Sequence, residues 1–104
     1  MPSKAELSEI KYHLEQTYQD RLEEVYLYGS EARGTAGADS DIDLLVVLKG
    51  PVHLWEDIRA GIRALYPLSL RLGRCMSPKC VDARDYRAGV CPFYDTVLRE
   101  GIRL

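Results

Sequence analysis

The stretch "IDLLVVL", residues Ile42 to Leu48, constrains the fold of this chain more than any other. Its five consecutive apolar residues lack the alternation of a strand with one polar face. Such a run predicts a strand that is buried on both faces. Asp41 and Asp43 lie at the start of this strand, where an unpaired buried carboxylate is costly. We therefore expect a group beside them that offsets their charge.

Helices are predicted on both sides of this strand in the sequence. Ser3-Lys4-Ala5-Glu6 has the S-x-x-E form of a capping box and begins an apolar pattern of helical period, which predicts a helix from about Ser3 to Asp20. A second amphipathic helix is expected over 54–66, ending before Pro67. Its apolar positions are Leu54, Trp55, Ile58, Ile62 and Leu65.

Two further strands are expected. Val25–Tyr28 is β-branched and aromatic and stops at Gly29, and "LSLRL" at 68–72 alternates like a strand with one polar face. Ser77-Pro78 and Pro92 can each begin a helix, the second running through Arg99. Gly101 can close that helix before a last segment, residues 102–104. The order α-β-β-α-β-α-α predicts an α+β fold with helices packed on a small mixed sheet.

Length and composition limit the class of protein. The 104 residues are expected to form a single domain, 1–104, around one core. The longest apolar run is far shorter than the roughly 20 residues of a membrane helix, and no signal pattern is present, so we expect a cytoplasmic protein that does not bind membranes. Three cysteines without a C-x-x-C pair argue against disulfides and a zinc site.

The net charge of −2 hides an asymmetry between the two halves of the chain. Residues 1–58 carry five basic and twelve acidic side chains, whereas residues 59–104 carry nine basic and four acidic ones. This polarity suits a charged protein partner, although solvated surfaces often show similar imbalances. A nucleic-acid-binding domain is usually basic as a whole, so we expect no direct nucleic-acid binding.

The residues between the first two strands can bind phosphate and metal. A strand that ends in Gly29-Ser30 and turns into a short helix presents free backbone N–H groups, although Ser30 could simply be a helix N-cap. Asp41 and Asp43 are two residues apart on a strand and therefore project to the same face. Such a carboxylate pair suits Mg²⁺, which often completes its coordination with phosphate oxygens and water.

Together these residues form the pattern G-S-x10-D-x-D, inside "GSEARG" and "SDIDLL". The chain resembles the minimal nucleotidyltransferases of the DNA polymerase β superfamily, whose motif is G-S-x10-D-x-D. The resemblance implies that Gly29 and Ser30 hold the triphosphate of ATP, that Asp41 and Asp43 bind Mg²⁺, and that Ser30, Asp41 and Asp43 are the catalytic residues. Arg33 is a candidate for a further phosphate contact, since guanidinium pairs well with phosphate; a plain surface arginine is the alternative.

Active members of this family usually carry a third carboxylate on the next core strand. In the predicted strand "LSLRL" the corresponding polar residues are Ser69 and Arg71, neither of which is acidic. An arginine there would repel a second cation, so the site could bind one metal and transfer slowly, or only bind nucleotide. Asp82 and Asp85 could replace the missing acid only if the chain folds back toward the site.

Several proteins of this family resemble antitoxins encoded beside a helical HEPN ribonuclease toxin, and some transfer AMP to a tyrosine hydroxyl of that toxin. The resemblance thus implies an Mg²⁺-dependent protein adenylyltransferase that acts as an antitoxin in a hetero-oligomer. An inactive antitoxin that inhibits its partner by binding, and a transferase acting on a small molecule, are the alternatives. Tyr26 and Tyr28, beside the Gly-Ser turn, are expected to serve packing.

Overall fold

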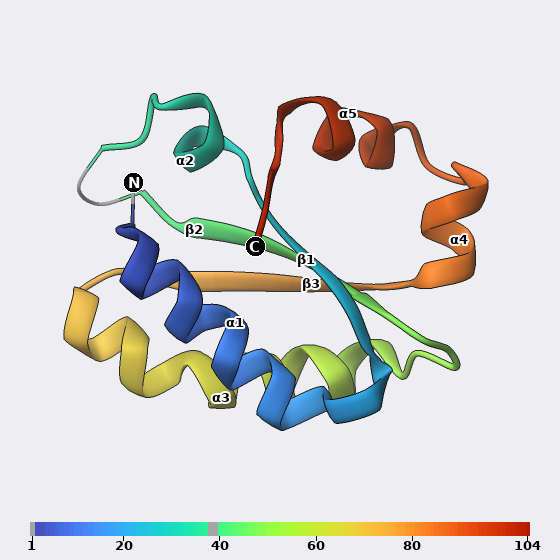
Figure 1. The fold of residues 1–104 in the computed structure, drawn as a ribbon, viewed down its shortest axis with the longest axis horizontal. Coiled ribbons are helices and arrows are strands. Elements are labelled where there is room, and N and C mark those ends of the chain that lie inside the picture. Colours follow the sequence, from blue (N-terminus) through green and yellow to red (C-terminus); the bar gives the residue numbers. More distant parts are fainter. Residues whose placement is uncertain (1, 38–39) are drawn as a thin grey trace.

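The computed structural model describes residues 2–37 and 40–104 and contains one four-stranded sheet (Figure 1). The strands are β1 (Leu22–Tyr28), β2 (Ile42–Leu48), β3 (Met76–Asp82) and β4 (Ile102–Arg103), in the spatial order β3-β2-β1-β4. β2 runs parallel to β3 and antiparallel to β1, and β4 pairs antiparallel with β1. The predicted α+β class with a mixed sheet is confirmed.

The two faces of β2 bury separate sets of apolar side chains. Ile42, Leu44, Val46 and Leu48 pack with residues of α1 (Lys4–Tyr18) and α3 (Leu54–Leu72). Leu45 and Val47 face the opposite way, toward α4 (Ala83–Ala88) and α5 (Pro92–Glu100). This double coverage explains why the stretch has no alternation of polar residues, and the predicted strand Ile42–Leu48 is confirmed with both its ends.

The N-terminal half agrees closely with the sequence pattern. In the capping box at α1, the backbone N–H of Glu6 donates to the Ser3 hydroxyl at 3.1 Å and that of Ser3 donates to the Glu6 carboxylate at 2.8 Å. α1 ends at Tyr18, and a 3₁₀ turn, η1 (Gln19–Arg21), replaces the last predicted helical residues. β1 ends at Tyr28 as expected but begins three residues earlier than predicted.

The predicted end of the second helix is wrong. α3 continues through the exposed Pro67 to Leu72, so the strand predicted at 68–72 does not exist. Leu65 and Leu68 are buried against the sheet and Leu72 packs beside them, at the i, i+3 and i+7 spacing of one helix face. Because this packing outweighs the missing N–H of one proline, the helix is extended by nearly two turns.

The next strand therefore lies further along the chain than predicted. β3 occupies Met76–Asp82, which includes the Ser77-Pro78 pair that was expected to begin a helix. As the edge strand beside β2, β3 can accommodate a proline without breaking the sheet. α5 begins at Pro92 as predicted and ends one residue later, at Glu100.

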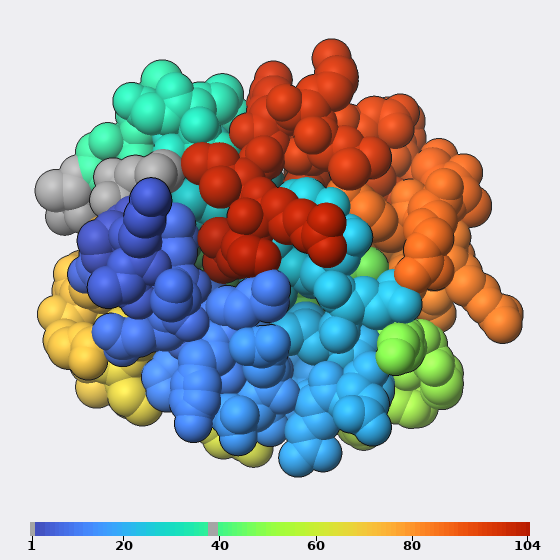
Figure 2. Space-filling view, in the orientation of Figure 1, coloured from blue at the N-terminus to red at the C-terminus, as the bar shows by residue number. Residues whose placement is uncertain are grey.

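The C-terminal segment lies on the surface beside α1. Figure 2 shows residues 101–104, in red, next to the blue N-terminal helix, and the Lys11 ammonium donates to the Leu104 carbonyl at 2.9 Å. β4 thereby covers the outer edge of β1. Over the part of the chain that the structure describes, no helix has the length and apolar character needed to cross a bilayer.

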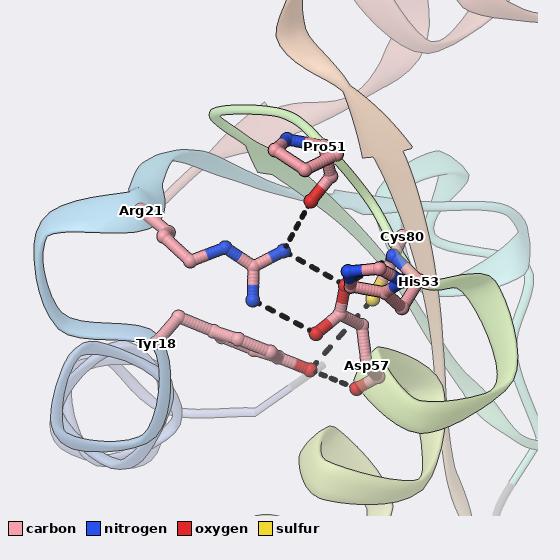
Figure 3. A network of polar contacts seen from close by, with 6 residues as sticks. All are labelled: Tyr18, Arg21, Pro51, His53, Asp57 and Cys80. Atoms are coloured by element: carbon pink, nitrogen blue, oxygen red, sulfur yellow. Dashed lines mark hydrogen bonds and ion pairs between the residues drawn. The ribbon is translucent and has the colours of Figure 1, made fainter.

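A polar network connects the α1 and α3 layer to the sheet (Figure 3). Arg21 donates to both carboxylate oxygens of Asp57, at 2.9 and 2.8 Å, and to the Pro51 carbonyl at 3.1 Å. The Tyr18 hydroxyl donates to the Asp57 carbonyl and lies 3.7 Å from the Cys80 sulfur on β3. These contacts fix the start of α3 relative to the end of α1.

Candidate nucleotide site

The Gly-Ser turn and the aspartate pair meet at one end of the sheet. Tyr28, the last residue of β1, lies directly opposite Asp43 in the antiparallel pair with β2. Gly29 therefore follows beside the Asp43 carboxylate. A Cβ atom at Gly29 would lie only 2.6 Å from the Asp43 Oδ2 atom. Gly29 also has φ +75° and ψ −152°, a backbone conformation that is accessible essentially to glycine alone.

A single helical turn, α2 (Ser30–Arg33), follows this glycine. Gly29 is the N-cap residue of α2, so Ser30 is its first residue and not the cap. The Arg33 N–H bonds to the Gly29 carbonyl at 3.2 Å, and the Thr35 N–H bonds to the Ser30 carbonyl at 3.0 Å. The turn thus has the geometry in which backbone N–H groups point out of a helix start.

Asp43 lies on the face of β2 that is turned toward α5, and Asp41 directly precedes the strand. Asp41 is exposed, whereas Asp43 is partly buried beside Gly29. Burial, and next the negative charge of Asp41, raise the pKa of the Asp43 carboxyl above its usual range. Lys79 and Arg33 act in the opposite direction and lower this pKa. The neighbouring cations therefore offset the negative charges of Asp41 and Asp43 only in part, and a bound cation would offset the remainder.

The chemistry of these residues fits a divalent metal ion. Asp41 and Asp43, whose charges act on each other, provide hard oxygen ligands, and the missing side chain of Gly29 leaves room next to Asp43. Within residues 2–37 and 40–104, no group of three or more His, Cys, Asp or Glu side chains could hold a metal. An ion held by Asp41 and Asp43 would therefore take its remaining ligands from phosphate oxygens and water.

The strand that faces the aspartates is β3, and it offers no carboxylate at this end. Ser77 lies opposite Asp43 in the parallel pair, and Lys79 is the next residue on the same face. The prediction that Ser69 and Arg71 occupy this position is wrong, because both lie on α3 and Arg71 forms an ion pair with Glu9. Nevertheless, β3 has no acidic residue from Met76 to Lys79, the part of the strand that lies beside the aspartates.

Asp82 and Asp85 do not replace the missing acid. Asp82 lies at the other end of β3, opposite Leu48, and its carboxylate accepts a hydrogen bond from the Arg84 N–H at 2.8 Å as the N-cap of α4. Asp85 follows within α4. Asp82 lies five residues along β3 from Ser77, the partner of Asp43, or roughly 16 Å away at the usual rise per residue.

Aromatic side chains line the site on the α5 side. Tyr28 and Phe93 pack edge to face with ring centroids 5.2 Å apart, and the Lys79 ammonium lies 5.3 Å from the centroid of Phe93. Burial and the charge of Asp43 raise the pKa of Tyr28 to about 12. Tyr26 is buried in the second core cluster. Both tyrosines pack, as predicted, and Tyr28 also borders the site.

A buried ion pair connects the two parts of the site, and no local sequence pattern predicts it. Glu31 of α2 is 1% exposed and pairs with the Arg74 guanidinium. Arg74 also donates to the Ser40 carbonyl, from Nε at 3.1 Å and from Nη2 at 2.6 Å. Ser40 directly precedes Asp41, so one arginine connects the Gly-Ser turn to the aspartate strand. The 43-residue separation of Glu31 and Arg74 hides this pairing from any local motif.

Arg33 lies at an exposed position beside the site. Its side chain is about half exposed and lies 3.9 Å from the Glu100 carboxylate of α5. Its charge nevertheless reaches Asp43, whose pKa it lowers. The predicted site residues therefore all lie at one end of the sheet: Gly29, Ser30, Arg33, Asp41 and Asp43.

Known structures share this fold. A toxin–antitoxin crystal structure with AMP-PNP superposes with a TM-score of 0.57 at 23% identity, covering 90% of this chain and 68% of that one. Two structures of MntA-HpeT toxin–antitoxin variants superpose with TM-scores of 0.57 and 0.59 at 22% identity. They cover 100% and 94% of this chain and 72% and 70% of theirs. No curated protein sequence matches the chain significantly.

The sequence itself matches a known family across the same region. The family model described as "Nucleotidyltransferase domain" aligns with residues 7–77, from α1 to the second residue of β3. This range is more than half of the chain, and it contains the Gly-Ser turn, α2 and both aspartates. The resemblance carried by "GSEARG" and "SDIDLL" is thus confirmed, and the chain belongs to the nucleotidyltransferase domain family.

Proposed function

We propose that this protein is an Mg²⁺-dependent nucleotidyltransferase that transfers AMP from ATP to a tyrosine hydroxyl of a HEPN-type toxin and thereby acts as an antitoxin. The contact of Gly29 with Asp43 is the observation that carries the proposal. It joins a turn suited to phosphate and a carboxylate pair suited to metal at one end of the sheet. Membership of the nucleotidyltransferase domain family supports the reaction class.

Each site residue then has a defined task. The Gly29-Ser30 turn holds the triphosphate through backbone N–H groups and the Ser30 hydroxyl, and Arg33 reaches an outer phosphate. Asp41 and Asp43 hold Mg²⁺, which when bound neutralises phosphate charge and orients the reacting oxygens. The Glu31–Arg74 pair keeps the two halves of this arrangement at a fixed distance.

The proposed transfer exchanges one phosphorus–oxygen bond for another. The tyrosine oxygen forms a bond to the α-phosphorus of ATP, the bond to the bridging oxygen between the α- and β-phosphates breaks, and pyrophosphate leaves. The hydroxyl proton passes to water. With a cation held by Asp41 and Asp43 to offset the phosphate charge, the Gly29-Ser30 turn would keep the triphosphate at this end of the sheet, where Asp41 is exposed and an acceptor from outside can approach in line.

The outer face of α3 supports a protein partner. Trp55, Tyr66 and Leu70 are each more than half exposed, and Arg59 and Arg63 lie among them at helical spacing. Three of the apolar positions predicted to anchor this helix, Leu54, Trp55 and Ile62, are in fact exposed. Contiguous exposed apolar surface marks interaction sites, and Trp, Tyr and Arg dominate binding hot spots. The similar folds of toxin–antitoxin complexes support a toxin as that partner.

Labelled ATP provides a direct test. The protein is incubated with ATP labelled at the α-phosphate and Mg²⁺, with and without the product of the adjacent gene. We expect label on that protein, and none with Asp41→Asn or Asp43→Asn. Asp20 is an exposed acid in η1, so Asp20→Asn serves as the matched control and should leave labelling unchanged. Absence of label from the wild-type reaction, or equal labelling by the Asp41→Asn variant, would rule out the proposed transfer.

A second candidate is an antitoxin of this fold that inhibits its partner by binding alone. The observation that favours it is the presence of Ser77 and Lys79, and no acid, opposite the aspartates. In that case the double variant Asp41→Asn, Asp43→Asn still forms the complex and still inhibits. Loss of inhibition by the double variant, with complex formation intact, would decide for the enzyme.

A further inference from the structure

Lys79 is the cation of β3 that faces the candidate site. It follows Ser77 on the face of β3 that carries Asp43 across the parallel pair, opposite Leu45 in register. With strands about 4.8 Å apart and a rise of about 3.3 Å per residue, neighbours offset by two residues lie roughly 8 Å apart, within reach of a long side chain. The Lys79 ammonium lies over Phe93, whose ring packs on Tyr28 directly opposite Asp43. Its charge therefore lies beside the aspartates.

We propose that Lys79 supplies the positive charge that a second divalent ion would otherwise bring, so that the site binds its nucleotide with a single divalent ion held by Asp41 and Asp43. This inference rests on the proposed function, since it requires a nucleoside triphosphate at the Gly29-Ser30 turn. It adds the number of metal ions and a residue that the motif does not contain.

The argument starts from charge balance. Asp41 and Asp43 carry two negative charges, which one divalent ion neutralises. A second ion would need further oxygen ligands on the neighbouring strand, and that strand offers the Ser77 hydroxyl and an ammonium group. The ammonium of Lys79 repels a second cation, whereas it attracts phosphate oxygens. Lysine is a known phosphate ligand that acts as a compact point charge.

The surroundings of Lys79 fit a lysine that acts on a ligand. Its side chain is exposed and has the Phe93 ring beneath it, which holds the ammonium near the site without neutralising it. Among the described residues, the ion pairs of this region belong to other cations: Arg33 pairs with Glu100 and Arg74 pairs with Glu31.

Counting bound manganese tests the inference without measuring transfer. The full chain is dialysed to equilibrium against Mn²⁺ and a non-hydrolysable ATP analogue, and the manganese and nucleotide bound per chain are determined. For the wild type we expect one manganese ion per nucleotide. Lys79→Asp should raise this ratio toward two, because it replaces the ammonium with a third carboxylate. Lys49→Asp, an exposed lysine directly after the opposite end of β2, is the matched control and should keep the ratio at one.

Nucleotide affinity provides the second measurement. Lys79→Gln removes the charge from an exposed side chain and should weaken analogue binding about tenfold, the effect of losing one charge-assisted phosphate contact. Two manganese ions per nucleotide in the wild type, an unchanged ratio for Lys79→Asp, or unchanged affinity for Lys79→Gln would each overturn the inference and leave the proposed function intact. A wild type that binds no nucleotide at all would overturn both.

Discussion

At the scale of single residues, Gly29 allows the Gly29-Ser30 turn to lie against the Asp43 carboxylate. Its backbone conformation is accessible essentially to glycine, and a Cβ atom would lie 2.6 Å from the Asp43 carboxylate. Gly29→Ala should cost about 1–3 kcal/mol of stability through backbone strain. It should also displace Asp43 and weaken the binding of a metal–nucleotide complex at least tenfold. Urea unfolding would measure the loss of stability, and titration calorimetry would measure the loss of affinity.

Gly73→Ala separates backbone strain from the contact with Asp43. Gly73 ends α3 with φ +66°, but a Cβ atom there meets nothing within 4 Å. This variant should lose about 1–2 kcal/mol of stability, from the left-handed backbone alone, and retain nucleotide binding. Equal binding by the two alanine variants would show that the close approach of Gly29 to Asp43 has no part in the site.

The sequence predicts some residues of this site and conceals others. Gly29, Ser30, Asp41 and Asp43 are recognisable because one local pattern contains them all. Lys79 is different: its place opposite the aspartates depends on the register of β3 against β2, and register is a property of the packed sheet. Once β3 is assigned to 76–82 and not to 68–72, Arg71 leaves the site and Lys79 enters it.

At the scale of secondary-structure elements, α3 shows packing that outweighs a local signal. Pro67 lies within the helix, where a proline removes one backbone hydrogen bond and crowds the preceding turn, at a cost of roughly 3 kcal/mol. Pro67 is exposed and has no packing role to lose. Pro67→Ala should therefore raise the free energy of unfolding by about 1–3 kcal/mol, since the lower entropy of the unfolded chain with proline offsets part of the gain. Urea unfolding would measure this gain in the free energy of unfolding, and we expect its dependence on urea concentration to be unchanged.

Leu68→Ala examines the packing that carries the helix past the proline. Leu68 is 2% exposed in the core beneath α3, and its truncation should cost about 2–5 kcal/mol. A destabilised Pro67→Ala variant would contradict this account and indicate that the proline itself holds the helix end. Sequence signals place the end of the helix before Pro67 because they do not take tertiary packing into account. That packing buries one continuous face of the helix, formed by Leu65, Leu68 and Leu72.

At the scale of the whole molecule, the sequence predicts the order of elements better than their positions. The capping box and the apolar run of β2 are local signals, and both are confirmed where they were expected. β3 is missed because Ser77-Pro78 resembles a helix start, and only its place at the sheet edge permits a strand there. The edge pairing of β4 is too short to leave a clear pattern.

The polar network around Asp57 connects α3 to the end of α1 and to β3. From it we predict how the stability of the molecule changes at acidic pH. The hydrogen bonds from Arg21, and next the bond from the His53 N–H, hold the pKa of the Asp57 carboxyl below its usual range. A carboxyl whose pKa is lower in the folded state than in the unfolded state stabilises the fold at pH values above its unfolded-state pKa, which is about 3.9 for aspartate. That contribution is lost as the pH falls through the still lower pKa of the folded state.

Asp57→Asn should therefore lower the free energy of unfolding by about 1–3 kcal/mol at pH 7, less than for a fully buried pair because the Arg21 side chain is 37% exposed. The difference from the wild type should shrink as the pH is lowered from 4 toward 2, which urea unfolding at each pH would measure. Glu9→Gln is the control, since Glu9 forms an exposed pair with Arg71, and it should change stability by less than about 1 kcal/mol. A deficit of Asp57→Asn that stays the same at low pH would mean that the shape of this side chain, and not its charge, joins α3 to the end of α1.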